Sequence, residues 1–251
     1  MRRLILLFAL VAPILLLLVW PHSIPLAILI LATSHALILY PTLRPNVQWL
    51  GPVITSFQPE GREVWLTIDD GPCDDTLGLL DELDTRGAKA TFFVKGELAR
   101  ARPDLVRTIA ARGHGIANHS ETHPAASFWC LPPGSLAREI DGCSEAIRSI
   151  TGSDTGWFRA PVGMKNPAVH PLLARRQMRL IGWSIRGFDS IAREAGPVIR
   201  RIVPKVQPGS IIVMHQGRAI STACVTGVVD ALLAQGYSFV IPSDERLNTS
   251  R

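Results

Sequence analysis

Apolar residues follow two different patterns along the chain. Residues 4–43 contain no Asp, Glu, Lys or Arg, and two long apolar runs within them flank a short break at 20–23. After Val64, short runs rich in β-branched and aromatic residues alternate with stretches in which apolar residues have helical spacing. The first pattern is typical of membrane-spanning helices, and the second is typical of a soluble α/β domain.

The apolar beginning predicts a membrane anchor over residues 1–43, made of two helices at about 4–20 and 24–43. A cleavable signal peptide has one apolar core of about 7–15 residues and then a small-residue cleavage site, whereas here a second long run follows. Arg2 and Arg3 favour a cytoplasmic N-terminus by the positive-inside rule.

A transmembrane helical hairpin then returns the chain to the cytoplasmic face of the membrane, which we expect to be a bacterial inner membrane. One span followed by an interfacial segment is the alternative, and it places the rest of the chain on the outer face. We favour the hairpin, so the main domain is expected to be membrane-anchored on the cytoplasmic side.

The remainder divides into a linker, a domain and a tail. Residues 44–61 are Pro-rich and aperiodic, 62–242 form the domain, and 243–251 are polar. Strands are predicted at 64–68, 90–94, 115–118, 157–159, 179–183, 210–214 and 237–241. Helices are predicted near 75–86, 103–112, 135–150, 167–176, 194–205 and 220–235. This alternation predicts a parallel sheet, doubly wound or closed into a barrel, with its chemistry at the carboxyl ends of strands.

Charge and cysteine usage exclude several classes of partner. The 26 Lys and Arg exceed the 21 Asp and Glu by only 5, and the longest basic clusters are pairs without interleaved aromatics. Nucleic acid is therefore not an expected partner. The cysteines form no C-x-x-C pair, which argues against a structural zinc site or a disulfide-dense module. Free thiols are expected, although Cys130 and Cys143 could pair.

Two adjacent carboxylates directly follow the first predicted strand. Asp69 and Asp70 end the run at 64–68 and precede Gly71-Pro72. Carboxylates in this position face mutual repulsion and desolvation unless a cation or a catalytic task holds them there. The nearby Asp74 and Asp75 are instead interpreted as part of a helix N-terminus.

Two histidines follow the strand predicted at 115–118. His119 and His123 stand at i and i+4, which places both imidazoles on one face if the segment is helical, and two such rings can share a metal. A carboxylate from another strand end would complete a site with two His, one carboxylate and open positions. Ser120 replaces the Glu of the metalloprotease pattern H-E-x-x-H, so a metalloprotease is the weaker interpretation.

Three more polar groups stand at or shortly after later strand ends. Arg159 begins the segment Arg-Ala-Pro-Val-Gly over 159–163, Asp189 follows Trp183, and His215 ends an apolar strand. A buried His is more often structural than catalytic, but a strand end in this architecture is where catalysis is expected. These groups are therefore predicted to face the same region as the carboxylates.

The motifs occur in the order T-x-D-D-G-P, H-S-x-x-H, R-x-P-x-G, a Trp and an Asp, and an apolar run ending in His. In this the chain resembles the polysaccharide deacetylases, the carbohydrate esterase family 4 proteins that carry the NodB homology domain. The resemblance covers roughly residues 62–242. It implies a distorted (β/α)7 barrel, similar to a TIM barrel, and a metal-dependent hydrolase that removes N-acetyl groups from N-acetylated sugars.

The resemblance also implies the metal and the base. Asp70, His119 and His123 would bind a divalent metal, commonly zinc. Asp69 would be the general base that activates the attacking water, and Arg159 would be paired with it. Amide hydrolysis needs a nucleophile at neutral pH and a polarised carbonyl, which a metal and a base together supply.

The acid half of the reaction follows from the same resemblance. His215 would be the general acid that protonates the leaving amine, with Asp189 orienting it. The backbone N–H of Val162 would stabilise the oxyanion. An amine is a poor leaving group without a proton, so this acid completes the catalytic set.

The chain departs from the family pattern at four positions. Ile68 replaces a usual Phe and Val162 a frequent Tyr, and neither change removes a catalytic group. Arg186 stands where the fourth motif has its first Asp, and Ser190 stands where it has an aromatic residue. We interpret Arg186 as a sign of altered substrate choice, in which the substrate carries an anionic group such as a lipid phosphate. The alternative is that Arg186 pairs with a neighbouring acid.

The expected partners are the membrane and an N-acetylated carbohydrate, either a glycan or a lipid-linked saccharide. A domain on the cytoplasmic side favours a lipid-linked or precursor sugar, and a domain outside favours finished cell-wall polymer. A deformylase of a lipid-linked amino sugar is a variant with the same chemistry. The alternative to an enzyme is a catalytically silent, membrane-anchored module that binds a glycan. The oligomeric state does not follow from the sequence.

Overall fold

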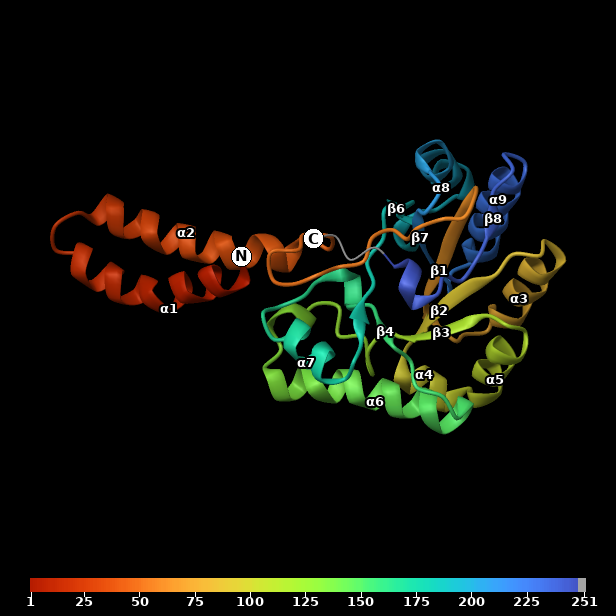
Figure 1. Cartoon of the computed structure of the whole chain (residues 1–251), viewed down its shortest axis with the longest axis horizontal. Helices are drawn as coiled ribbons and strands as arrows, with labels where there is room; N and C mark the ends of the chain where they lie inside the picture. The colour runs from red at the N-terminus through yellow and green to blue at the C-terminus, as the bar shows by residue number, and fades with distance from the viewer. Residues whose placement is uncertain (248–251) are drawn as a thin grey trace.

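The computed structural model describes residues 1–247, as a helical hairpin that projects from an α/β domain (Figure 1). The end of the predicted polar tail, 248–251, lies outside the described residues. Helices α1 (Arg2–Val19) and α2 (Ile24–Leu43) form the hairpin, so both predicted apolar helices are present. The side chain of Ser23 accepts a hydrogen bond from the N–H of Leu26 and caps α2, whose first turn contains a proline.

The two hairpin helices pack closely along small residues. Ala12, Ala27 and Ser34 are buried where the helices meet, and small side chains allow such close approach of two backbones. Larger apolar side chains face outward, and Leu10 and Leu17 are each 74% exposed. The hairpin therefore has an apolar outer surface that the domain does not cover.

The domain is built on a parallel sheet. Its strands are β1 (Glu63–Gly71), β2 (Ala90–Val94), β3 (Gly115–Asn118), β4 (Trp157–Phe158), β5 (Arg179–Leu180), β6 (Ile185–Arg186), β7 (Ile211–His215) and β8 (Ser238–Phe239). The order is β5-β4-β3-β2-β1-β7-β6, with β8 beside β1, and all these strand pairs are parallel. Every predicted strand is present, and the two-residue strand β6 was not predicted.

Helices cover the outer face of the sheet (Figure 1). They are α3 (Thr76–Thr85), α4 (Gly96–Ala101), α5 (Pro103–Ala111), α6 (Pro133–Thr151), α7 (Val169–Arg175), α8 (Ala195–Ile202) and α9 (Ser221–Leu233). Short 3₁₀ turns lie at η1 (Phe128–Cys130), η2 (Pro161–Gly163), η3 (Asp189–Ile191), η4 (Val203–Lys205) and η5 (Asp244–Arg246). All six predicted helices are found, and α4 was missed because six residues are too few to show a helical period.

The prediction of a distorted barrel of parallel strands is confirmed, and the distortion lies between its two edge strands. Within residues 1–247, β5 and β6 do not pair with each other. Instead Ile54 bridges to Ile181 and Ser56 bridges to Ser210. The segment 44–61, which is predicted to be a linker, therefore lies along this opening. Residues 243–247 also pack on the domain, since Leu247 is buried and bridges to Phe57.

Alternation along the strands separates an inner core from an outer one. In β1, Val64, Leu66 and Ile68 pack in the outer core with the helices, whereas Trp65 packs inside the barrel with Phe93. Successive side chains of a strand point to opposite faces, so Asp69 continues the inner series. The four cysteines are free, as expected.

Candidate active site

Asp69 and Asp70 both reach the barrel mouth because β1 is irregular at its end. Adjacent residues of a regular strand would point to opposite faces. Here the register with β2 shifts between Asp69 and Gly71, and Asp70 adopts a left-handed φ of 77°. A bulge of this kind re-aims a side chain, and it turns Asp70 toward the same region as Asp69.

His119 and His123 converge through a turn rather than on one face of a helix. Ser120 and His123 have positive φ values of 68° and 54°, which a helix excludes. The hydroxyl of Ser120 accepts the backbone N–H of His123 at 3.0 Å and closes the turn, and Pro124 follows it. Glu121 points away from the pair and forms an ion pair with Arg100.

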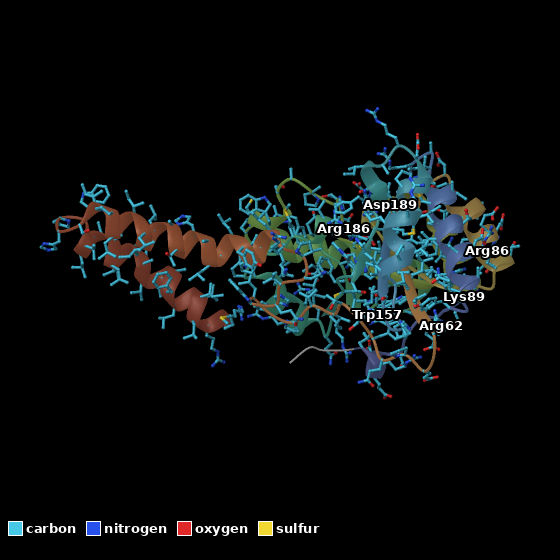
Figure 2. All side chains as sticks on the ribbon, turned by 90° about the horizontal axis from the view of Figure 1, so that it is seen from above. Arg62, Arg86, Lys89, Trp157, Arg186 and Asp189 are labelled. Atoms are coloured by element: carbon cyan, nitrogen blue, oxygen red, sulfur yellow. The ribbon has the colours of Figure 1, made fainter. Side chains whose placement is uncertain are left out.

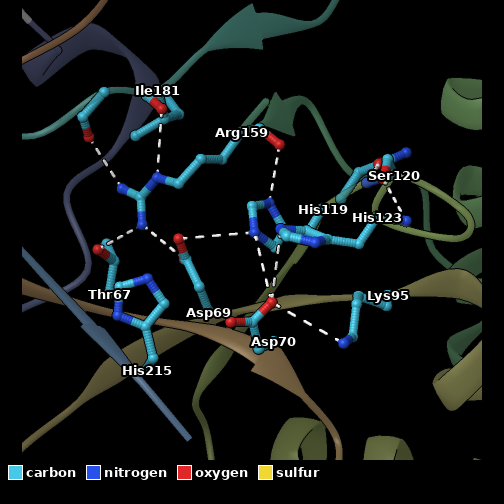
Figure 3. A network of polar contacts seen from close by, with 12 residues as sticks. Thr67, Asp69, Asp70, Lys95, His119, Ser120, His123, Arg159, Ile181 and His215 are labelled. Atoms are coloured by element: carbon cyan, nitrogen blue, oxygen red, sulfur yellow. Dashed lines mark hydrogen bonds and ion pairs between the residues drawn. The ribbon is translucent and has the colours of Figure 1, made fainter. Parts of the chain in front are cut away.

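Asp70, His119 and His123 present a set of atoms suited to a divalent cation (Figure 3). One ligand atom of each lies within 4.8 Å of the other two. His119 Nδ1 donates to the carbonyl of Arg159 at 2.9 Å, which leaves Nε2 as the lone-pair atom facing Asp70 Oδ1 at 3.9 Å. Asp70 Oδ1 is buried without a hydrogen-bond partner, so the residues fit a metal ion.

The electrostatics of His123 agree with a ligand role. Burial, together with the charge of His119, lowers the pKa of His123 to about 4. The ring is therefore neutral at neutral pH, which is the form that binds a metal. His123 Nε2 lies 3.6 Å from Asp70 Oδ1.

Asp69 is held by a buried guanidinium. Arg159 Nη1 donates to Asp69 Oδ1 at 2.7 Å and to the hydroxyl of Thr67 at 2.7 Å, and its other nitrogens donate to the carbonyls of Ile181 and Gly182. Burial raises the pKa of Asp69, but attraction to Arg159 and the nearby histidines outweighs burial and holds the pKa below its usual value. Asp69 is thus ionised, with Oδ2 facing His119 Nε2 at 3.7 Å (Figure 3).

His215 lies across the mouth from the histidine pair and is oriented by Asp189. Asp189, at the start of η3, is buried and accepts two hydrogen bonds from His215, from the backbone N–H at 2.6 Å and from Nδ1 at 3.1 Å. Burial lowers the pKa of His215, but the bond to Asp189 and the charges of Asp69, Asp189 and Asp70 raise it above its usual value. The ring can therefore hold a proton on Nε2 for transfer.

These groups surround one pocket of about 140 Å³. It is lined by Asp69, Asp70, His119, His123, Val162, Gly163, Trp183, Arg186, Ser190, Val213 and His215. Six of the eight predicted site residues are in this lining, and the other two, Arg159 and Asp189, contact lining residues directly. The structure thus brings the whole predicted set together around a single pocket.

Val162 occupies a strained conformation at the pocket wall. Its φ of 48° is rare for a β-branched residue, and it lies within η2 between Pro161 and Gly163. Strain of this kind persists only where the surroundings hold it in place, and it is concentrated at functional sites.

Arg186 lies at the pocket rim without a carboxylate partner. Its guanidinium carbon stands 3.8 Å from the ring centre of Phe188 and 5.8 Å from that of Trp183. Within residues 1–247 no acid lies within ion-pair distance of Arg186, and the carboxylate of Asp189 attracts it from farther away. Figure 2 shows Arg186 on the part of the domain toward the hairpin, with Arg86 and Lys89 on the far side.

Lys95 and Thr67 also contact the site residues, and neither was predicted. Lys95 directly follows β2 and its Nζ lies 3.9 Å from Asp70 Oδ1. The rule that strand ends carry the site could have found it. Thr67 supports Arg159 from the inner face of β1, two residues before Asp69, and alternation along that strand is the signal that points to it.

Comparison with known proteins gives consistent matches. A family model described as polysaccharide deacetylase matches residues 57–181. The chitooligosaccharide deacetylase of Rhizobium leguminosarum bv. trifolii is 32% identical over 179 residues, which are 70% of this chain and 82% of that protein.

Two solved structures show the same fold. The peptidoglycan deacetylase PdaC from Bacillus subtilis matches with a TM-score of 0.67 and 26% identity, over 73% of this chain and 89% of that chain. A CE4 family pseudoenzyme from Bacillus anthracis matches with a TM-score of 0.68 and 26% identity, over 76% of this chain and 68% of that chain. Because one of the two is a pseudoenzyme, the fold alone does not establish activity, and the site residues must be judged individually.

Proposed function

The chain belongs to the polysaccharide deacetylase family, and on that premise we propose that it is a metal-dependent hydrolase that removes N-acetyl groups from an amino sugar. The observation that carries the proposal is the meeting of three metal-binding atoms with two hydrogen-bonded pairs, Asp69–Arg159 and His215–Asp189, around one pocket. A binding module has no need of an acid and a base on opposite sides of a ligand.

A divalent metal held by Asp70, His119 and His123, for which we propose Zn²⁺, would supply a Lewis acid that polarises the amide carbonyl. Asp69 Oδ2 accepts the proton of the attacking water, since Oδ1 is engaged by Arg159. Arg159 keeps that carboxylate ionised and fixes its direction. The backbone N–H of Val162 donates to the oxygen that becomes negative as the tetrahedral centre forms.

His215 completes the reaction as the acid. Its Nδ1 is engaged by Asp189, so Nε2 is the atom that gives a proton to the amine as the C–N bond breaks. The products are a free amino sugar and acetate, and the proton accepted by Asp69 balances the one that His215 delivers. Both groups line the same pocket, which supports action on a single bound amide.

We propose that the hairpin anchors the enzyme in a membrane. Both helices are long and apolar enough to cross a bilayer. In the most apolar 18-residue stretch of each helix, only 11% of the residues of α1 and 22% of those of α2 are buried, unlike the core helices of a soluble protein. Their lengths, at 1.5 Å per residue, come to about 27 and 30 Å, close to the bilayer core.

The base of the hairpin supports a cytoplasmic domain. Arg2 donates to the carbonyl of Pro167, and the N–H of Lys165 donates to the carbonyl of Thr42, so both helices end against one segment of the domain. The N-terminus and the domain then lie on the same side of the membrane. Arg2, Arg3 and Arg44 gather at this end, which favours the cytoplasm. A fused C-terminal reporter active only outside would contradict this orientation.

The test is release of acetate by the full-length protein from N-acetylated chitooligosaccharide and from lipid-linked N-acetylated amino sugar. We expect Asp69→Asn to lower the rate by about 10²–10⁴-fold, because the base is lost while the shape is kept. Asp74→Asn is the control, since its side chain is 94% exposed and forms a surface pair with Arg102. Equal rates for Asp69→Asn and wild type would sink the catalytic assignment, and formate in place of acetate would identify a deformylase.

A further inference from the structure

A second pocket, of about 360 Å³, lies at the base of α2. It is lined by Tyr40, Arg44, Pro45, Asn46, Val47, Trp183 and Arg186. Trp183 and Arg186 also line the catalytic pocket, so the two pockets meet across these two side chains. We call this second pocket the hairpin-base pocket.

The hairpin-base pocket has a fixed position relative to the catalytic pocket. The side chain of Lys165 is buried and donates to the carbonyls of Arg44 and Pro45, at 2.7 and 2.8 Å, just beyond the end of α2. Asn46 Nδ2 donates to the carbonyl of Trp183 at 2.6 Å. These bonds attach the exit of the apolar hairpin to the domain beside the segment that carries Val162.

Two guanidinium groups in this pocket have no acid within ion-pair distance among the described residues, and the Asp189 carboxylate that attracts Arg186 from farther away already accepts two hydrogen bonds from His215. Arg44 and Arg186 both form no ion pair within the described part of the chain, residues 1–247. Aromatic rings support them instead: Arg44 lies 5.8 Å from the ring centre of Tyr40, and Arg186 lies against Phe188. A guanidinium stacked on a ring keeps its N–H donors in a fixed plane, an arrangement that suits the oxygens of a phosphate.

The position of the pocket at the end of α2 indicates which kind of phosphate could reach it. It begins where the apolar surface of α2 ends, and Tyr40 and Trp49 pack there at a tilt, with ring centres 5.0 Å apart. Aromatic residues at the end of an apolar helix mark the level of the lipid headgroups. A phosphate bound beside Arg44 would therefore lie at headgroup level, while a sugar attached to it could extend past Trp183 to the catalytic pocket.

We propose that the hairpin-base pocket binds the phosphate of a lipid-linked amino sugar, through Arg44 and Arg186, while the acetamido group enters the catalytic pocket. This names the substrate class of the proposed deacetylase and rests on that function and on the membrane anchor. It holds for either side of the membrane, since the pocket is tied to the end of α2.

Binding of farnesyl phosphate to the full-length protein in detergent, measured by calorimetry, tests the proposal without any need for catalysis. Farnesol is the control ligand without the phosphate, and inorganic phosphate is the control ligand without the lipid tail. We expect farnesyl phosphate to bind more tightly than both, and Arg186→Gln and Arg44→Gln each to weaken it by about 10-fold or more. Arg138→Gln, on the exposed face of α6, is the control and should leave binding unchanged.

Equal binding of farnesol and farnesyl phosphate, or unchanged binding in both arginine variants, would overturn the phosphate site. Inorganic phosphate binding as tightly as farnesyl phosphate would overturn the lipid as its source. Failure of the deacetylase proposal is seen separately, as absence of acetate from every N-acetylated substrate. A rise in KM for lipid-linked substrate in Arg186→Gln, with a smaller change in kcat, would add support from turnover.

Discussion

The two sides of the candidate active site are built differently. On the metal side, formed by Asp69, Asp70, His119, His123 and Arg159, polar atoms are held by backbone and side-chain hydrogen bonds, and charges are paired. On the rim, formed by Arg44, Trp183, Arg186 and Phe188, the cations rest on aromatic rings and form no ion pair within residues 1–247.

The difference separates chemistry from substrate choice. A buried network held by hydrogen bonds and ion pairs has one arrangement and leaves little freedom in where a reacting amide can sit. Exposed arginines on aromatic supports can change without disturbing that network. The departures from the family pattern at Arg186 and Ser190 both lie on the pocket lining near the rim, where such changes alter what is bound.

The largest effect is expected for Arg159→Met. Removing this cation leaves Asp69 buried and unpaired, which should lower the free energy of unfolding by about 3–5 kcal/mol and abolish acetate release. Chemical denaturation of the full-length protein in detergent measures the loss. Arg148→Met removes an exposed pair with Asp154 and should cost less than about 1 kcal/mol. Similar losses in both variants would show that the metal side is not a specially paired network.

The next effect concerns the pH dependence set by His215. Its raised pKa means that the ring keeps its proton to a higher pH than an ordinary imidazole and loses it as the pH rises further. A deprotonated ring cannot protonate the amine, so kcat should fall on the alkaline side. Asp189→Asn removes one charge that raises this pKa, and the alkaline limb should move to lower pH.

His215→Ala should lower kcat by about 10²–10⁴-fold over the whole range and remove the alkaline limb. The rates of acetate release from pH 5 to 10 measure both variants. An unmoved alkaline limb in Asp189→Asn would show that another group sets it.

A smaller effect is expected where the rim meets the hairpin. Gly163 has φ 72°, and a Cβ there would lie 2.6 Å from Pro45 and 2.6 Å from Trp183. Gly163→Ala should therefore cost about 1–3 kcal/mol from crowding in addition to about 1–2 kcal/mol from the backbone. Gly152→Ala, at φ 74° with no atom within 4 Å of the added carbon, carries only the backbone cost. Thermal unfolding compares the two, and equal losses would show that the hairpin base is not closely docked.

Much of the site could be predicted because parallel strands bring their carboxyl ends together. Asp69 and His215 follow directly from alternation, since each continues the inner series of its strand. These two residues could be predicted because each stands at the carboxyl end of a strand, even though they are far apart in the sequence. The long strands and helices were found for the same reason, that their periods extend over enough residues to be recognised.

The rest depends on local irregularities that no period reveals. Asp70 enters the site through a bulge, and His119 and His123 meet through a turn with positive φ at two ordinary L-residues. Contacts between distant segments are equally invisible, such as Lys165 bonding the end of α2. Each of these features is specified by tertiary surroundings rather than by neighbours in the chain.

The most direct test of the account is a titration of chelator-stripped full-length protein with Zn²⁺ while acetate release from a lipid-linked N-acetylated amino sugar is followed. Within residues 1–247, two His and one carboxylate form one candidate set of metal ligands. We predict no acetate without metal, and a rate that rises linearly to a plateau at one equivalent of Zn²⁺ per chain. Undiminished acetate release by the stripped protein, or no release at any metal content, would contradict the account.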